Sequence, residues 1–315
     1  DGDRAMQALA QKLVQAGADE EPKTEDGMRI FVGPWGSCVA FLDRGQLTAE
    51  ARGKLRDTWR TYMPYRGDTE NHWLLYYATL YLMSQQWPNE PGDRWYTGKS
   101  SAENFAESRD YIESWIDLTV TKGQGEYDCT HYIGVYLLPL SYLAAWAEDP
   151  RMRDRARKML DWVIADYAVE SLNGIYVGAH ARTDDVQVLE KWNGVSSDFG
   201  WLLFGQGHPL PGFSYYGFFY AASSAYQPPP ILDRIATDRS RPFAHREHKR
   251  TRNRWRFTEE RHAPVYKTTF LHRDYAVSSD QGGILQPIQQ HSWDVTWALD
   301  DPRGVTVVHV ESAVE

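Results

Sequence analysis

Four groups of polar side chains in this sequence have the types and spacing needed for acid–base chemistry. Each lies where an apolar helical run begins or where a loop follows one. The groups are Glu70-Asn71-His72, the stretch from Glu126 through Asp128 to His131, Tyr132 and Tyr136, the pair His180 and Arg182, and His208. Imidazole, phenol and carboxyl groups exchange protons, and amides stabilise developing negative charge. We predict that Asn71 and His72 share a cleft with Tyr132 or Tyr136.

Any one of these residues also has a simpler interpretation as a hydrogen-bonded core residue. Their joint position at helix starts makes that interpretation weaker for the set than for its members. Asn71 and His72 begin a helix, where free backbone N–H groups and the helix dipole favour a bound anion. The histidine spacings contain no compact metal-ligand motif such as His-Glu-x-x-His, so we expect neither a metal nor another cofactor.

Composition limits the classes of function. The chain has 315 residues, 42% of them apolar, with 13 Trp and 19 Tyr. Such aromatic content is typical of clefts that bind sugar rings, although bulky core filling explains it equally well. The net charge of -9 argues against nucleic-acid binding. No apolar run is long enough for a membrane span, and we expect a secreted or periplasmic protein of unknown oligomeric state.

The elements that must position these residues are mostly helices. One-faced apolar patterns at 48–62, 99–120 and 149–174 alternate with runs that are apolar on every side at 68–88 and 131–146. A further one-faced helix is predicted at 3–16, an irregular or short-strand segment at 29–44, and less regular helices at 199–204, 212–226 and 231–237. Inner helices covered by an outer ring would produce this alternation. We therefore predict an incomplete α/α toroid over residues 1–238.

The pattern changes towards the end of the chain. A basic stretch within 239–264 is interpreted as a solvated linker, or alternatively as the basic wall of a groove between domains. From Val265 the apolar period becomes two, which predicts an antiparallel β domain over 265–315. Its few strands cannot close a sandwich alone. The sheet must lie on the helical domain or continue in further sequence.

Two series of short motifs resemble known lyases. Asn71-His72 on an aromatic helix, followed later by Tyr136 and a Leu-Leu-Pro-Leu run, resembles the toroidal alginate lyases. A second series resembles the heparinase II/III-like and related α/α-toroid lyases that end in a β-sandwich. It consists of Glu126 and Tyr132, Leu137 to Leu140, Asp149-Pro150, Leu160-Asp161, Leu172-Asn173-Gly174 and His180-Ala181-Arg182. The similarity covers roughly residues 65–300.

The resemblance implies β-elimination on a uronic-acid polysaccharide, an anionic substrate. It assigns Asn71 and His72 to the substrate carboxylate, and either Tyr132 or Tyr136 to proton exchange at C5 and O4. The other residues that we expect at the site are His131, His180 and Arg182 as catalytic helpers, and Glu70, Glu126, Trp192 and His208 as substrate-binding groups.

Two other classes of protein remain open. A toroidal glycoside hydrolase needs two carboxylic acids across a cleft. The candidates are Glu70, Glu126, Asp128, Asp184 and Asp185. A carbohydrate-binding protein without catalysis would keep only the aromatic side chains.

Overall fold

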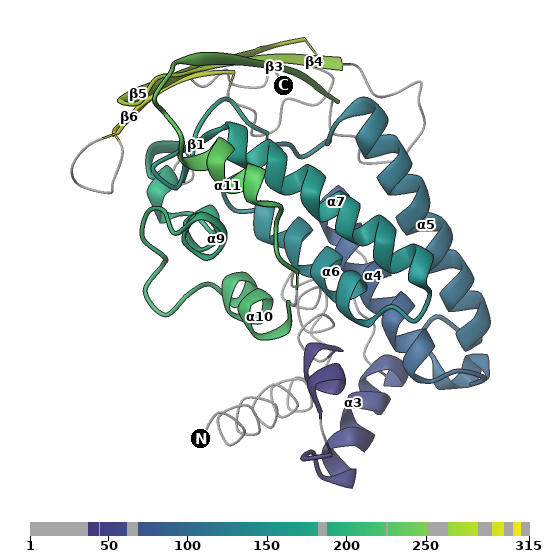
Figure 1. Cartoon of the computed structure of the whole chain (residues 1–315). Helices are drawn as coiled ribbons and strands as arrows, with labels where there is room; N and C mark the ends of the chain where they lie inside the picture. The colour runs from purple at the N-terminus through teal and green to yellow at the C-terminus, as the bar shows by residue number, and fades with distance from the viewer. Residues whose placement is uncertain are drawn as a thin grey trace.

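The computed structural model describes residues 37–43, 45–61, 69–181, 188–224, 226–250, 264–282, 292–298 and 305–309. It consists of a mainly helical region followed by an antiparallel sheet that lies across one end of the helices (Figure 1). This order confirms the predicted change from helices to strands. The predicted helix at 3–16 and the residues Arg182, Asp184 and Asp185 lie outside the described residues.

Two helices form the interior of the helical region. Helix α4 (Glu70–Gln86) and helix α6 (Ile133–Trp146) are buried along nearly their whole length and pack against each other. Neither has a polar face, so neither can lie at the surface without exposing large apolar side chains. The predicted buried helix at 131–146 is confirmed, with Pro139 inside it.

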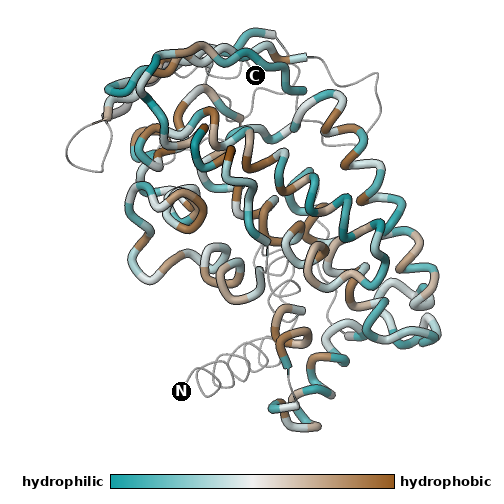
Figure 2. Tube along the Cα trace, in the orientation of Figure 1, coloured by the Kyte–Doolittle hydropathy of each residue, from teal (hydrophilic) through white to brown (hydrophobic). Residues whose placement is uncertain are grey.

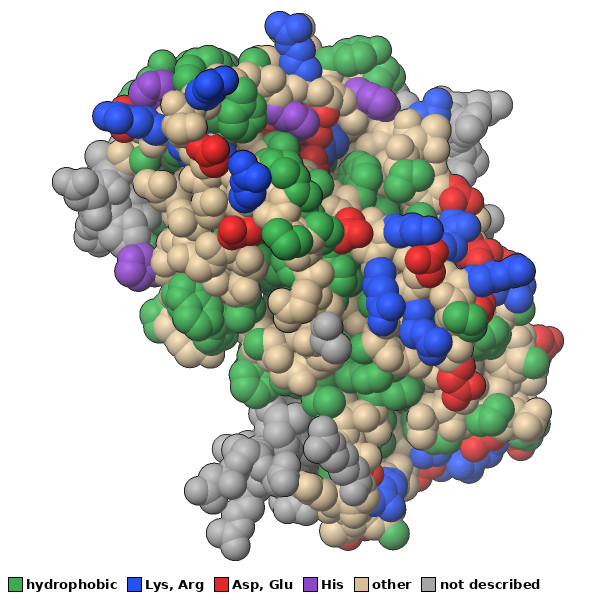
Figure 3. Space-filling view, viewed as in Figure 1, with side chains coloured by type: hydrophobic (Ala, Val, Ile, Leu, Met, Phe, Trp, Pro, Cys, Tyr) green, Lys and Arg blue, Asp and Glu red, His purple; other side chains and the backbone are tan. Residues whose placement is uncertain are grey.

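Two one-faced helices cover this pair. Helix α5 (Ser101–Lys122) packs on α4, and helix α7 (Pro150–Val169) packs on α6. Figure 2 shows apolar and polar residues alternating along α7, and Figure 3 shows charged side chains over the outer surface of both helices. Ser100 and Glu103 form a capping box at the start of α5, and the Asp149 side chain accepts from Arg151 N–H at the start of α7.

The remaining helical elements are shorter. Helix α3 (Ala49–Thr61) begins at the predicted cap, because Thr48 Oγ1 accepts from Ala51 N–H at 3.1 Å. Residues 37–42 are helical, so the predicted irregular or strand character is wrong there. The other elements are the 3₁₀ turns η1 (Gly92–Arg94) and η2 (Lys191–Asn193), and helices α9 (Ser196–Phe204), α10 (Tyr215–Ser223) and α11 (Pro230–Thr237).

A small hairpin follows α7. Strands β1 (Ser171–Leu172) and β2 (Ile175–Tyr176) pair antiparallel. The two residues between them, Asn173 and Gly174, have φ values of 52° and 81°. Two successive positive φ angles are typical of the tight turn that matches the twist of a hairpin, and Asn-Gly is the sequence that best tolerates them.

The large sheet has five strands in the order β3-β4-β5-β6-β7, each antiparallel to its neighbour. The strands are β3 (Phe243–Arg250), β4 (Pro264–Leu271), β5 (Tyr275–Gln281), β6 (Trp293–Trp297) and β7 (Val305–His309). Residues 251–263 of the predicted solvated linker lie outside the described residues. Strand β3 shows that the prediction is wrong at 243–250. It carries polar side chains on both faces, so it lacks the alternation of apolar residues that identified the other strands.

The polarity of this sheet is inverted. On its buried side stand polar and charged residues such as Lys267, Thr269 and Asp294, whereas Phe270, Val277 and the exposed Trp297 occupy the opposite face. The charged side lies against the helical region, as one of the two predicted arrangements requires. Among the described helices, none combines the length and hydropathy needed to cross a membrane.

Candidate functional site

The loop over residues 123–132 joins three of the predicted polar groups. Glu126 Oε2 accepts from the backbone N–H of Asn71 at 2.9 Å and also from the Asn71 side-chain amide. Next along the loop, Tyr127 O accepts from Ala181 N–H at 3.1 Å, which places His180 beside it. The start of α4, this loop and the segment after β2 therefore meet at one place.

Glu126 completes the start of α4. The local N-cap residue, Thr69, makes no side-chain capping bond, so the first N–H groups of the helix need another acceptor. The carboxylate of Glu126 supplies it from the distant loop. The anion that the sequence predicted for this helix start is thus a side chain of the same protein, and Glu126 has a structural role where we predicted substrate binding.

Glu70 is the centre of a second buried set of hydrogen bonds. It is 5% exposed. Its carboxylate accepts from Trp115 Nε1 and Gly125 N at 2.8 Å, from Glu126 N at 3.0 Å and from Tyr136 Oη at 3.3 Å, and it pairs with Arg250. Both oxygens are engaged with the protein. The predicted contact of Glu70 with substrate is therefore replaced by a role in fixing the loop to α4, α5 and β3.

The two candidate tyrosines differ in environment. Tyr136 is buried and stacks on Trp115 with ring centroids 5.9 Å apart. Burial, with the nearby Glu70 and Glu126, raises the pKa of the Tyr136 phenol well above its usual value. A phenol of raised pKa is a poor base at neutral pH. Tyr136 joins Asn71 in one hydrogen-bonded network through Glu126 and Glu70, but the two meet in the core and not in an open cleft.

Tyr132 has the exposure that Tyr136 lacks. It is the half-buried N-cap residue of α6. The ring of His131 lies 5.6 Å from that of Tyr132 and 6.2 Å from that of Tyr216, between centroids. His72 is also half-buried at the start of α4, whereas Asn71 is fully buried. Of the two predicted tyrosines, Tyr132 is therefore the more accessible.

The other predicted residues divide between core and surface. His180 is buried, with Nδ1 3.3 Å from Ala181 O. Trp192 and His208, both predicted to bind substrate, line a common cavity of about 240 Å³ with Asn193 and Ser197. The structure thus brings together two residues whose proximity the sequence could not show.

A charged network beneath the sheet was not predicted. Lys249 Nζ on β3 lies 2.9 Å from Asp128 Oδ1, 2.5 Å from Asp166 Oδ2 and 2.9 Å from Glu247 Oε2. Lys267 Nζ on β4 lies 2.5 Å from Asp128 Oδ2 and also pairs with Glu170. Four carboxyl groups therefore surround two ammonium groups. In the sequence, Lys249 and Lys267 are only lysines within strand-like segments. The alternation of residues along a strand does not say which of its two faces is buried.

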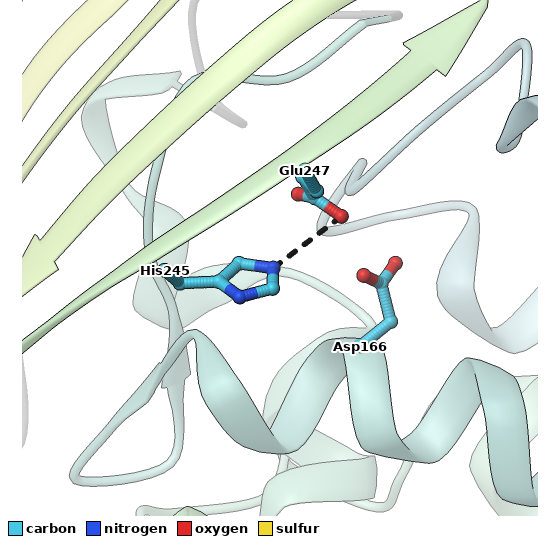
Figure 4. Close-up of side chains that lie close together, drawn as sticks. All are labelled: Asp166, His245 and Glu247. Atoms are coloured by element: carbon cyan, nitrogen blue, oxygen red, sulfur yellow. Dashed lines mark ion pairs between the residues drawn. The ribbon is translucent and has the colours of Figure 1, made fainter.

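Part of this network has the geometry of a metal site (Figure 4). Asp166 from α7 and His245 and Glu247 from β3 offer ligand atoms within 4.8 Å of one another. The ammonium of Lys249 already bonds both carboxylates of this group. A second group, Asp128, Glu170 and Glu247, is bridged in the same way by Lys267. In both groups a lysine supplies the positive charge that a cation would bring.

The surplus of carboxyl groups alters their pKa values. Burial, followed by the charge of Glu247, raises the pKa of Asp166 well above its usual value. Burial raises the pKa of Glu170 to about 7 although Lys267 opposes it. Burial also disfavours ionisation of Glu247, but Lys249, His245 and Lys267 outweigh it and hold that pKa well below normal. The carboxyl groups of one network therefore differ in pKa: that of Asp166 and of Glu170 is raised, and that of Glu247 is lowered.

The chain was compared with protein families, curated proteins and solved structures. None of the three comparisons found a match.

Proposed function

We propose that this protein is a polysaccharide lyase of the α/α-toroid type that cleaves a uronic-acid polysaccharide by β-elimination. The observation that carries the proposal is the meeting of the α4 start, the 123–132 loop and the His180 segment at one place. That meeting puts histidines and a half-buried tyrosine around one loop. The inner pair α4 and α6, covered by α5 and α7, is the arrangement expected for part of a toroid, and ring closure is part of the proposal.

The proposed reaction needs three groups. His72, as an imidazolium, pairs with the uronate carboxylate and stabilises the negative charge that develops when C5 loses its proton. Tyr132 takes that proton as a phenolate, after it has passed its own hydroxyl proton to His131. The C4–O4 bond then breaks with formation of a C4=C5 double bond, and the leaving oxygen receives a proton from the same tyrosine or a neighbouring histidine. Buried Asn71 fixes the position of His72 through its bonds to Glu126.

The rival hydrolase has less support. Its candidates Glu70, Glu126 and Asp128 are buried and bonded to groups of the protein itself. A pair of hydrolytic carboxyl groups must flank an open cleft. The remaining candidates, Asp184 and Asp185, lie outside the described residues.

The first test is a panel of uronic-acid polysaccharides screened for near-ultraviolet absorbance. A lyase produces an absorbing unsaturated uronide. A hydrolase produces reducing ends without this absorbance, and a binding protein produces neither. Reducing ends alone, or no product from any polymer, would refute the lyase proposal.

Tyr132→Phe and Tyr136→Phe are a matched pair for the second test. Each removes one hydroxyl and keeps the ring. We expect turnover to fall by about a hundredfold or more in Tyr132→Phe, the usual scale for loss of a general acid or base. Tyr136→Phe should stay within a few-fold of the unaltered protein, with a loss of stability of about 1 kcal/mol for its hydrogen bond. Full turnover in Tyr132→Phe would exclude the role proposed for that residue.

A further inference from the structure

We infer that the cavity between Trp192 and His208 is a subsite for one pyranose ring of a glycan, next to the proposed catalytic loop. The choice of a sugar as the ligand rests on the proposed function. The existence of the cavity does not depend on that function, because it follows from the positions of the lining residues alone. It is lined by Trp192, Asn193, Ser197 and His208 together with Gly174, Ile175, Gly207, Pro209, Leu210 and Pro211.

The size of the cavity limits the ligand. Its volume of about 240 Å³ is below the roughly 300–1,000 Å³ of sites for drug-sized molecules. One sugar ring therefore fits, and a longer glycan would extend beyond the cavity.

The walls of the cavity are held in place by the backbone. At Gly174 an added Cβ would lie 2.6 Å from the carbonyl carbon of Gln206, so the hairpin turn and the segment before His208 touch directly. On the other side, the buried carboxylate of Asp198 accepts from Leu210 N–H at 2.8 Å and from Ser214 N–H at 2.7 Å. The loop that carries His208 is thus fixed at both ends before any ligand binds, which lowers the entropy cost of binding.

The lining has the chemistry of a sugar site. The half-buried Trp192 offers an apolar surface on which a ring can stack, and it packs against the apolar cluster that contains Ile175 and Leu271. Asn193 and His208 are exposed polar groups at the cavity, able to bond ring hydroxyls. No acidic, lysine or arginine side chain is among the described residues that line it. A neutral or singly anionic ring suits this lining better than a cation.

The cavity adjoins the proposed catalytic loop. Ser196, which follows the cavity-lining segment, donates its N–H to Thr130 O at 2.7 Å, beside His131. The Tyr167 hydroxyl lies 2.9 Å from Ser196 O and 3.0 Å from Gly174 O, and so ties the cavity floor to the same segment. One glycan can therefore occupy the cavity with one ring and the loop with a neighbouring ring.

The test uses methyl β-D-glucuronide and methyl β-D-glucoside as probes, with binding followed by saturation-transfer NMR and calorimetric titration. We expect binding that weakens about five- to tenfold in His208→Ala and in Asn193→Ala, the scale of one lost hydrogen bond. His248→Ala is the matched control, because His248 is an exposed histidine on β3 near Thr121 and away from the cavity. Both cavity residues are exposed, so the variants should fold, which thermal unfolding checks.

Two outcomes overturn the subsite. One is no binding of either probe, and the other is equal binding by the cavity variants and the control. Failure of the lyase proposal has a different signature. If no polymer gives an unsaturated product but the cavity variants still weaken probe binding, the subsite is supported and the lyase reaction is refuted. If lyase turnover is found and the cavity variants leave KM unchanged, the lyase reaction is supported and the subsite is refuted.

Discussion

At the residue scale, the predicted site residues divide into buried and half-buried side chains. Asn71, Glu70 and Glu126 have the residue types of a catalytic site, but all three are buried. Glu126 accepts a hydrogen bond from Asn71 N–H, and its own N–H donates to Glu70. His72, His131 and Tyr132 are half-buried, and the lyase proposal assigns the contacts with the substrate to them. Residue type is written in the sequence, whereas burial depends on segments that meet only in the fold.

Glu126 provides a test of this division. Glu126→Ala removes the acceptor for the first turn of α4 and leaves buried N–H groups without a partner. We expect the free energy of unfolding to fall by about 2 kcal/mol, and by less in Glu126→Gln, which keeps an acceptor oxygen. Urea unfolding measures both. The exposed Glu50→Ala is the control, and an equal effect in Glu126→Ala and Glu50→Ala would contradict the capping role.

At the element scale, the long helices could be predicted, whereas the helical turn at 37–42 and the strands β1, β2 and β3 could not. The burial of α4 and α6 follows from side chains that are apolar on every face, and the starts of α5 and α7 follow from capping residues. From the sequence, strand β3 is predicted to be a solvated linker because it is rich in charged residues. The partners of these residues are far away in the sequence. Lys249 pairs with Asp128 and Asp166, on a loop and on a helix that no local pattern connects to it.

The network that docks β3 and β4 gives a second prediction. Lys267→Met removes an ammonium that bonds Asp128 and Glu170 and leaves their charges buried without it. We expect a loss of about 3–5 kcal/mol in unfolding free energy, the usual cost of breaking a buried ion pair on one side. The exposed Lys54→Met should cost less than about 1 kcal/mol.

A double variant separates charge from shape. Adding Glu170→Gln to Lys267→Met removes the uncompensated carboxylate and should restore part of the lost stability. No restoration in the double variant would show that Glu170 is not the charge that Lys267 offsets, because Asp128 keeps its carboxylate in both variants.

At the scale of the whole molecule, attachment of the sheet to the helices should depend on pH. The pKa of Glu170 rises from 4.5 to about 7 on folding, so between those values the folded protein holds a proton that the unfolded chain has lost. Stability therefore falls as the pH rises through this window, by up to about 3 kcal/mol. Asp166, whose pKa is also raised by burial, acts in the same direction.

Two other carboxyl groups set the acid limit. Burial opposes ionisation of Glu247 and Asp128, but Lys249 and Lys267 hold both pKa values below normal. Their contribution is present above the unfolded values and is lost as the pH falls through the folded ones. We expect maximum stability in mildly acidic solution, measured by denaturant unfolding at a series of pH values. Glu170→Gln should flatten the alkaline side, and stability that rises steadily from pH 5 to 8 would contradict the assignment.

The bond between Asn71 and Glu126 also has a consequence for synthesis on the ribosome. These residues are 55 positions apart in the chain. At about 5–20 residues per second, α4 leaves the ribosome roughly 3–11 s before the carboxylate that completes its first turn. During that interval α4, which is buried along nearly its whole length in the folded protein, lacks both the Glu126 acceptor for its first turn and its packing partner α6. A nascent chain halted in this interval should therefore expose the apolar side chains of α4 to a chaperone.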